Sequence, residues 1–357
     1  MDSQSQNQSR NYVLIYPVYN LEISQDIGGE IQIERVTFVA RDKIPRIRRR
    51  LGFAKKISEE NKVWKKHHLP KFFSEASSYA LIAFRSKNNN EDMSEPINKI
   101  KEAFWILASS QFFLRRDFTK YFGSLEYQGN MITGFTLYDQ SQQFTIRHFK
   151  RINPLPYKLN KNWKTYKKNH FFSFLLKILN DNISENINSD WKKTIRNASI
   201  LAGKSIFSKE ISQSFLYNMI AIESLLGIDP SEKYPSSIIN RINALFGWLT
   251  QEDHKPWRKV IERLYELRCR LVHDGDIKDI STVDIIHSDC ILFNLLYNIC
   301  RSIKYFPSSQ SVSELSKKIQ ARKILGQKIK ERPKLRYFYP DLSVPTINGI
   351  KKANNWP

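Results

Sequence analysis

Cysteine is scarce in this chain, which has three in 357 residues: Cys269, Cys290 and Cys300. No two of them form a CxxC pair, so the sequence predicts neither a disulfide framework nor a zinc cluster. So few thiols fit a reducing cytoplasm, which is the expected compartment. P-loop, GxGxxG and GxSxG motifs are missing too, and the pair His67-His68 has no carboxylate or cysteine at ligand spacing. We therefore expect no metal and no cofactor.

Long apolar runs are also missing. No stretch approaches the roughly 18–20 apolar residues that span a bilayer, and the polar start MDSQSQNQSRNY lacks the apolar core of a secretory signal. We expect a protein that does not insert into a membrane. Hydrophobic residues still make up 41% of the chain, which is enough for a packed core, and the length indicates about two domains.

Negative charge is in deficit, with 35 Asp and Glu against 57 Lys and Arg, for a net charge of +22. The surplus of basic residues is distributed unevenly along the chain. Residues 201–310 contain 13 charges of each sign, residues 1–200 contain 33 basic against 19 acidic (+14), and residues 311–357 contain 11 against 3 (+8). The alternative is a general basic bias of the source proteome, but such a bias would also make residues 201–310 basic. The pattern favours a polyanionic partner, nucleic acid or an anionic membrane surface, contacted by two basic flanks.

The first half of the chain mixes β-rich and helical patterns. Four β-rich segments predict strands: 12–16, 30–39, 79–84 and 121–149. Gly28-Gly29 is typical of a hairpin between the first two, and residues 97–114 predict a helix. We interpret residues 1–185 as a mixed α/β domain for RNA recognition or regulation.

From residue 186 the apolar period becomes helical. Four helices are predicted: 207–227, 236–249, 255–273 and 282–306. Gly227 and Gly275 are placed to end the first and third of them. We interpret 186–310 as an all-α bundle and 311–357 as a basic tail, so the expected fold class is α+β, a mixed domain followed by a helical bundle.

The last predicted helix is apolar on two faces. One stripe contains Val283, Ile286, Cys290, Phe293, Tyr297 and Cys300, and the other contains Leu292, Leu296, Ile299 and Ile303. A helix with two apolar faces must bury both, whereas a small bundle uses one. The second face is then available to the N-terminal domain or to another copy of the chain, and we expect a homodimer.

The strongest local motif is Arg268-x4-His273, near the end of the third helix. Cutting RNA through its own 2′-hydroxyl requires a base, an acid and a positive charge beside the phosphorane. Histidine titrates near neutrality and serves as acid or base, and arginine is permanently charged and can bind two phosphate oxygens at once. Alternatively, Arg268 pairs with a helix neighbour such as Glu262, and His273 is an ordinary histidine at a helix C-terminus.

Helical geometry adds a condition to this motif. Five residues on an ideal helix turn through about 500°, which leaves the two side chains roughly 140° apart. They converge only if the helix ends at His273 or if a second protomer completes the site. Glu223, inside an otherwise apolar helix, is either a buried partner of Arg268 or a surface residue, and we favour the partner.

Two segments and the helix that follows them occur in an order that is known from other proteins. They are Ala221-Ile-Glu-Ser-Leu-Leu-Gly227 and Leu264-Tyr-Glu-Leu-Arg-Cys-Arg-Leu-Val-His-Asp-Gly275, followed by the long apolar helix. Over residues 205–307 this order resembles the Apea-like group of HEPN domains. The resemblance implies a helical bundle that dimerises and cuts RNA without a metal, leaving a 2′,3′-cyclic phosphate, often in antiviral, abortive-infection or toxin–antitoxin systems.

The resemblance also implies residue roles. Arg268 would bind the phosphate and His273 would be catalytic. Cys269 stands where the family often has Asn, Asp, Ser or Thr, and a thiol is only a weak hydrogen-bond group. Some members of the family are non-catalytic, and this departure favours that outcome.

Basic residues interleaved with aromatic residues occur in the flanks, as suits single-stranded RNA. The candidate RNA contacts are Arg48, Arg49, Arg50, Lys164, Lys167, Lys168, Lys328 and Lys330. The alternative is solvated lysine faces and, for the tail, a solvated chain end. The expected function is a metal-independent endoribonuclease of defence or stress. The alternatives are a non-catalytic module that binds nucleic acid or dimerises, and an effector held inactive by a regulatory protein.

Overall fold

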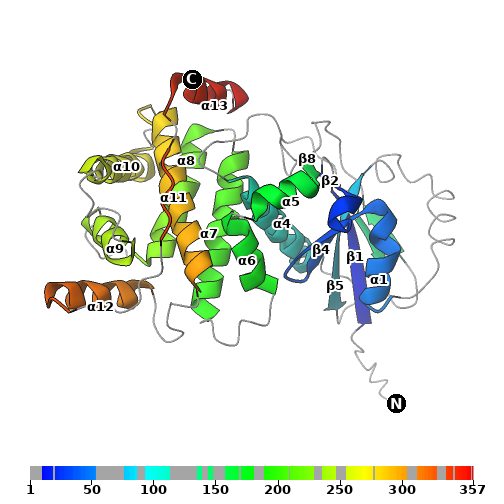
Figure 1. Ribbon diagram of the computed structural model, residues 1–357. Coiled ribbons are helices and arrows are strands. Elements are labelled where there is room, and N and C mark those ends of the chain that lie inside the picture. The colour runs from blue at the N-terminus through cyan, green and yellow to red at the C-terminus, as the bar shows by residue number, and fades with distance from the viewer. Residues whose placement is uncertain are drawn as a thin grey trace, which may run out of the picture. The chain divides into compact units, whose positions relative to one another are not determined.

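The computed structural model describes most residues of the chain. They are 10–18, 21–53, 76–86, 93–112, 135–138, 144–147, 157–168, 170–180, 189–208, 210–228, 235–246, 255–275, 278–303, 312–327, 335–340, 342–354 and 356. The chain forms two compact units (Figure 1). Unit 1 comprises Met1–Phe104 and Lys120–Lys168, and unit 2 comprises Trp105–Thr119 and Asn169–Pro357.

Unit 1 is built on a six-stranded antiparallel sheet in the order β3-β4-β5-β1-β6-β7. The strands are β1 (Arg10–Val18), β3 (Glu30–Ile33), β4 (Val36–Ala40), β5 (Ser78–Ser86), β6 (Phe135–Tyr138) and β7 (Phe144–Arg147). β1 and β5 pair along their whole length, from Arg10↔Ser86 to Val18↔Ser78. The predicted strands at 12–16 and 79–84 are confirmed, and their apolar character follows from their central positions in the sheet.

Residues 30–39 form two strands rather than the single predicted one. β3 and β4 pair from Glu30↔Val39 to Ile33↔Val36, and Glu34 between them has a positive φ of 54°. The hairpin predicted at Gly28-Gly29 is wrong, because β1 pairs with β5 and β6 instead of β3. β1 is apolar and buried almost throughout, so it takes a central position, whereas the half-exposed β3 lies at the sheet edge.

Smaller elements complete unit 1. They are β2 (Leu21–Ile23), which pairs in parallel with β8 (Tyr157–Leu159), the 3-10 helices η1 (Gln25–Ile27) and η2 (Arg41–Lys43), and the helices α1 (Ile44–Arg50) and α5 (Lys161–Lys167). Ile44 and Ile47 of α1 pack on Val13, Tyr79 and Leu81 of the sheet. The predicted helix at 97–114 is α4 (Ser94–Ala108), which is followed by η3 (Ser109–Gln111). The division between the two units falls within α4, after Phe104.

Unit 2 is a helical bundle. Its helices are α6 (Phe171–Asn180), α7 (Ser189–Phe207), α8 (Ile211–Leu226), α9 (Ser236–Phe246), α10 (Lys255–Asp274), α11 (Thr282–Ser302), α12 (Val312–Ile324) and α13 (Val344–Asn354). The four predicted helices correspond to α8, α9, α10 and α11, and the α+β fold class is confirmed. Gly203 in α7 is required by packing, since an added Cβ would lie 2.0 Å from the Trp105 carbonyl oxygen.

Both faces of α11 are covered by this chain itself. α11 packs against α6, α7 and α8 and also contacts α10 and α13 (Figure 1). By length and composition it is the one helix among the described residues that could cross a membrane, which the short apolar runs did not predict. The most apolar part of it is 89% buried inside the protein, as in the core helix of a bundle. The second apolar face is therefore not available to another copy of the chain.

The domain borders differ from the predicted ones. α6 and η3 belong to the helical unit, although both precede residue 186. The segment 311–357 is not simply a solvated tail, because Ile350 and Trp356 are buried and residues 336 and 338 hydrogen-bond to α11. The predicted strand segment 121–149 contains β6 and β7, and its other residues lie outside the described ones.

Candidate functional site

α10 positions both residues of the Arg268-x4-His273 motif. Its inner face is anchored by buried Trp257, Ile261, Leu264 and Leu267. The helix continues through His273 to Asp274 and ends where Gly275 takes a left-handed φ of 66°, a conformation that glycine adopts without strain. The predicted role of Gly275 is thereby confirmed.

Arg268 forms an ion pair with Glu223, in the last turn of α8. Arg268 Nε lies 3.0 Å from Glu223 Oε1, and an Nη2 hydrogen donates to Oε2 at 3.3 Å. The side chains are only 20% and 12% exposed. Burial raises the pKa of the Glu223 carboxyl, and the charge and hydrogen bond of Arg268 oppose that rise. Glu223 is thus a partner of Arg268, as favoured by the sequence, rather than a surface residue.

His273 and Cys269 differ from Arg268, and from each other, in how exposed they are. His273 is exposed in the last turn of α10, and Cys269 is a half-buried free thiol. Because α10 is a continuous helix past His273, the Arg268 and His273 side chains leave it roughly 140° apart. An early helix end, one of the two ways to bring them together, is not realised. The other predicted way to bring an arginine and a histidine together is a second protomer.

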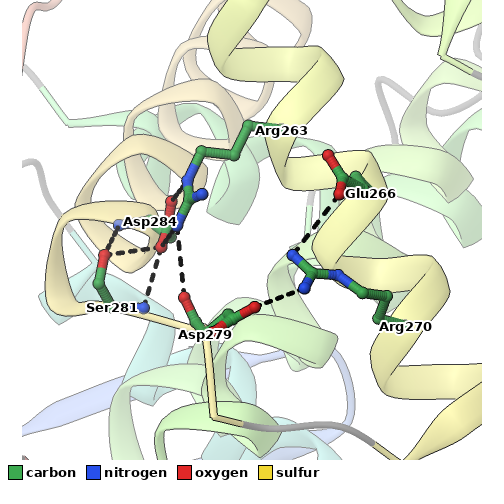
Figure 2. A network of polar contacts seen from close by, with 6 residues as sticks. All are labelled: Arg263, Glu266, Arg270, Asp279, Ser281 and Asp284. Carbon is green, nitrogen blue, oxygen red and sulfur yellow. Dashed lines mark hydrogen bonds and ion pairs between the residues drawn. The ribbon is translucent and has the colours of Figure 1, made fainter.

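An ion-pair network holds the connection from α10 to α11, and Figure 2 shows its six residues. Arg263 on α10 donates from Nε to Asp284 Oδ1 at 2.8 Å and from Nη2 to Oδ2 at 3.1 Å. Asp284 also accepts from the backbone N–H of Ser281 at 2.9 Å, within the capping box that begins α11. Burial alone would raise the pKa of Asp284, but the hydrogen bonds from Arg263 and Ser281 outweigh it and lower the pKa.

Arg270 belongs to the same network. It pairs with Asp279 in the connection, and its Nη2 lies 3.6 Å from Glu266 Oε1, one turn earlier on α10 (Figure 2). Arg263 Nη2 additionally donates to the Asp279 carbonyl oxygen at 3.3 Å. Two arginines of α10 thus fix the segment that follows His273, which restricts where the end of this helix can move.

The predicted RNA contacts fall into three groups. Arg48 and Lys167 are buried within unit 1, each 5% exposed, and so do not lie on the surface that a phosphate reaches. Arg49, Arg50, Lys164 and Lys168 are exposed, although Arg50 pairs with Glu30 at 2.9 Å. Lys328 and Lys330 lie outside the described residues. The structure therefore leaves four of the eight candidates on the described surface.

Buried polar side chains of α11 are the residues that the sequence patterns missed. Asn218 on α8 donates to Asp289 Oδ1 at 2.6 Å and to Ser288 Oγ at 2.9 Å inside the bundle. Asn294 and Asn298 are 3% and 2% exposed and bind the chain near residue 337. Two asparagines four residues apart in the apolar run ILFNLLYNIC were the available signal, because a buried amide requires partners.

Few side chains in the described part of the chain could support metal or thiol chemistry. No group of three or more His, Cys, Asp or Glu side chains there is arranged to hold a metal ion. Burial strongly raises the pKa of the Cys290 and Cys300 thiols, so both are protonated at neutral pH.

In comparisons with known proteins, no family model, no curated protein and no solved structure matches this chain.

Proposed function

We propose that this chain is a metal-independent endoribonuclease of the HEPN type. The observation that supports this most is the end of α10. There, a half-buried arginine is held by a carboxylate while an exposed histidine stands in the last turn of the same helix. Strand cleavage through the RNA 2′-hydroxyl requires a fixed positive charge and a side chain that can accept and donate a proton.

The contribution of Glu223 is to orient the guanidinium plane. Its Oε2 accepts a hydrogen bond from Arg268 Nη2 at 3.3 Å, and its Oε1 forms an ion pair with Arg268 Nε at 3.0 Å, so two points of contact set the orientation of the guanidinium. In the proposed reaction, Arg268 would bind the phosphate through its permanent charge. His273 would then take the proton of the 2′-hydroxyl or give one to the leaving 5′-oxygen.

The separation of Arg268 from His273 leads us to propose a homodimer as the active form. In a two-fold dimer each surface meets its own copy, so residues of one end of α10 face those of the other. The two helices joined by the Arg268–Glu223 pair each carry an exposed apolar side chain, since Val272 of α10 is 47% exposed and Ile220 of α8 is 38% exposed. They supply apolar area to such an interface.

Replacement of His273 tests the proposal. His273→Ala should slow cleavage of single-stranded RNA by about 10²–10⁴ without changing the circular dichroism spectrum or RNA affinity, and EDTA should leave the wild-type rate unchanged. Glu262→Gln, an exposed carboxylate on the same helix, is the matched control and should cut at the wild-type rate. A His273→Ala protein that cuts as fast as wild type would remove the catalytic assignment.

Mixing two inactive variants tests the two-chain site. If Arg268 of one protomer acts with His273 of the other, Arg268→Ala and His273→Ala proteins mixed in equal amounts should regain roughly a quarter of wild-type activity, because half of the dimers then contain one intact site. No recovery, with dimers present by sedimentation, would show that the two residues do not act across protomers.

A second candidate function is a non-catalytic module that binds nucleic acid or dimerises. The Arg268–Glu223 ion pair favours it, because the guanidinium already has a carboxylate partner and so has a structural role between α8 and α10. Wild-type protein that binds RNA but leaves it intact, with or without divalent cations, would favour this function over cleavage.

A further inference from the structure

Residues 335–340 lie along α11 through hydrogen bonds to two buried asparagines. Asn298 Nδ2 donates to the Arg336 carbonyl oxygen at 2.8 Å, and Asn298 Oδ1 accepts from the Arg336 N–H at 3.0 Å. Asn294 makes the same two bonds with Phe338, both at 2.9 Å. Each amide thus contacts both backbone groups of one residue and no side-chain polar group of that residue. We call residues 335–340 the strap.

The spacing of the two asparagines matches that of an extended chain. Four residues of an α-helix rise about 6 Å, and two residues of an extended chain advance about 6.7 Å. Asn294 binds residue 338 and Asn298 binds residue 336, so the strap runs antiparallel to α11. Asparagines repeated every four residues therefore form a template for any extended backbone.

The row of contacts has a defined end. Cys290, one turn before Asn294, directs its thiol to the Phe338 carbonyl oxygen at 3.2 Å. The next alternate residue of the strap is Pro340, which has no N–H to donate. The ladder is therefore limited to a short segment, as in a binding site of fixed length.

Each asparagine amide is also held by a hydrogen bond within α11 itself. The second N–H of Asn294 donates to the Cys290 carbonyl oxygen at 2.9 Å, and that of Asn298 donates to the Asn294 carbonyl oxygen at 2.9 Å. With the strap in place, the oxygen and both N–H groups of each amide are bonded. Without it, each amide would retain an unbonded acceptor and an unbonded donor in an apolar setting, which is unfavourable.

One side chain of the strap adds selectivity. The Phe338 ring packs edge-on against Phe293 and Tyr297 of α11, with centroid distances of 5.1 and 4.8 Å. By contrast, the next residue, Tyr339, is 56% exposed, and Arg336 is exposed. The contact surface therefore requires an aromatic ring at one position and accepts varied side chains beside it.

We propose that α11 carries a binding site for extended peptides with an aromatic residue at the position of Phe338, and that the strap is its exchangeable resident ligand. The site recognises a backbone and one ring, which is the chemistry of a segment such as Lys334–Pro340 supplied in trans. This activity is separate from RNA cleavage and does not depend on it. The resident strap competes at the high effective concentration of a tethered ligand, so a peptide enters only when the strap is weakened.

A labelled peptide with the sequence KLRYFYP tests the site in the full chain. Fluorescence anisotropy should show binding to the Phe338→Ala protein and none to wild type at the same peptide concentration. Adding Asn294→Asp to Phe338→Ala should weaken that binding roughly tenfold or more, because a carboxylate cannot donate to the peptide carbonyl. Asn240→Asp, an exposed residue of α9, is the matched control and should not change it.

Three results would overturn the proposal. They are a folded Phe338→Ala protein that takes up no peptide, equal binding after Asn294→Asp, and equal binding of a peptide with alanine in place of its phenylalanine. Hydrogen exchange of the wild-type chain gives a separate test that requires no variant to fold. The Arg336 and Phe338 amides should exchange slowly, whereas exchange at the rate of an open chain would contradict the ladder.

Discussion

At the residue scale, Arg268 has two competing roles, as the ion-pair partner of Glu223 and as the proposed phosphate ligand. A half-buried ion pair joins α8 to α10, and the same guanidinium is the proposed phosphate ligand. Removing one member of such a pair leaves the other charge poorly solvated, which costs more than the pair itself contributes. A mutation at this pair is expected to change stability as well as the proposed RNA cleavage, so stability and cleavage must be measured separately.

The pH dependence of Arg268→Ala follows from the raised pKa of Glu223. We expect this variant to lose about 1–3 kcal/mol of unfolding free energy at neutral pH, since an ionised carboxylate remains buried without its partner. Burial holds the Glu223 pKa above 4.5, and removing Arg268 raises it further. The loss should therefore shrink as the pH falls toward that pKa and the carboxyl becomes neutral, as measured by urea unfolding.

The control for this prediction is the double variant. Arg268→Ala with Glu223→Gln has no buried charge at this position, so its stability should lie above that of Arg268→Ala at neutral pH and should lack the same dependence on pH. If Arg268→Ala loses the same stability at every pH, the ion pair does not control this part of the bundle.

At the scale of the elements, the α10–α11 connection depends on Asp284. This carboxylate both caps α11 and binds Arg263, and its pKa is lowered below 3.8. Asp284→Asn should lower the unfolding free energy by about 1–2 kcal/mol at neutral pH. A depressed carboxyl pKa stabilises the fold fully above 3.8, and that contribution is lost as the pH falls through the folded-state pKa. The variant and wild type should therefore converge in acid.

Asp274→Asn is the matched control for this helix connection. Asp274 is an exposed carboxylate at the end of α10, so its replacement should change stability by no more than about 0.5 kcal/mol. A difference between Asp284→Asn and wild type that stays constant down to pH values well below 3.8 would show that the charge of Asp284 contributes nothing.

At the scale of the whole molecule, the uneven charge predicts how RNA binding responds to salt. Removing one cation that neutralises a phosphate should reduce the slope of log affinity against log salt by about 0.7–0.9. Replacing the exposed cations Lys317, Lys318 and Arg322 of α12 by glutamine should therefore lower the slope. These substitutions avoid the strap, whereas truncating the tail would also uncover Asn294 and Asn298.

Arg258 and Lys259, exposed on α10 in the neutral middle of the chain, provide the control pair. Their replacement by glutamine should leave the salt slope unchanged, because we expect the attraction to RNA to come from the basic flanks. Equal slopes for wild type and the α12 variant would mean that this helix does not contact RNA.

The sequence by itself determined the features that local chemistry controls. Apolar periodicity predicted α8, α9, α10 and α11, and the glycine after α10 predicted its end, because helix formation and capping depend on residues within a few positions of one another. The apolar strands at 12–16 and 79–84 followed from composition for the same reason. Arg268 and His273 could likewise be selected, since their chemistry belongs to the side chains.

Only the tertiary structure decided which surfaces meet. It paired β1 with β5, buried Arg48 and Lys167, joined Arg268 to Glu223 rather than Glu262, and covered the second face of α11 with the strap and its neighbouring helices. Such contacts join residues tens of positions apart, and many pairings satisfy the same apolar pattern. The choice among them depends on how all the surfaces pack together and on whether each buried polar group finds a partner.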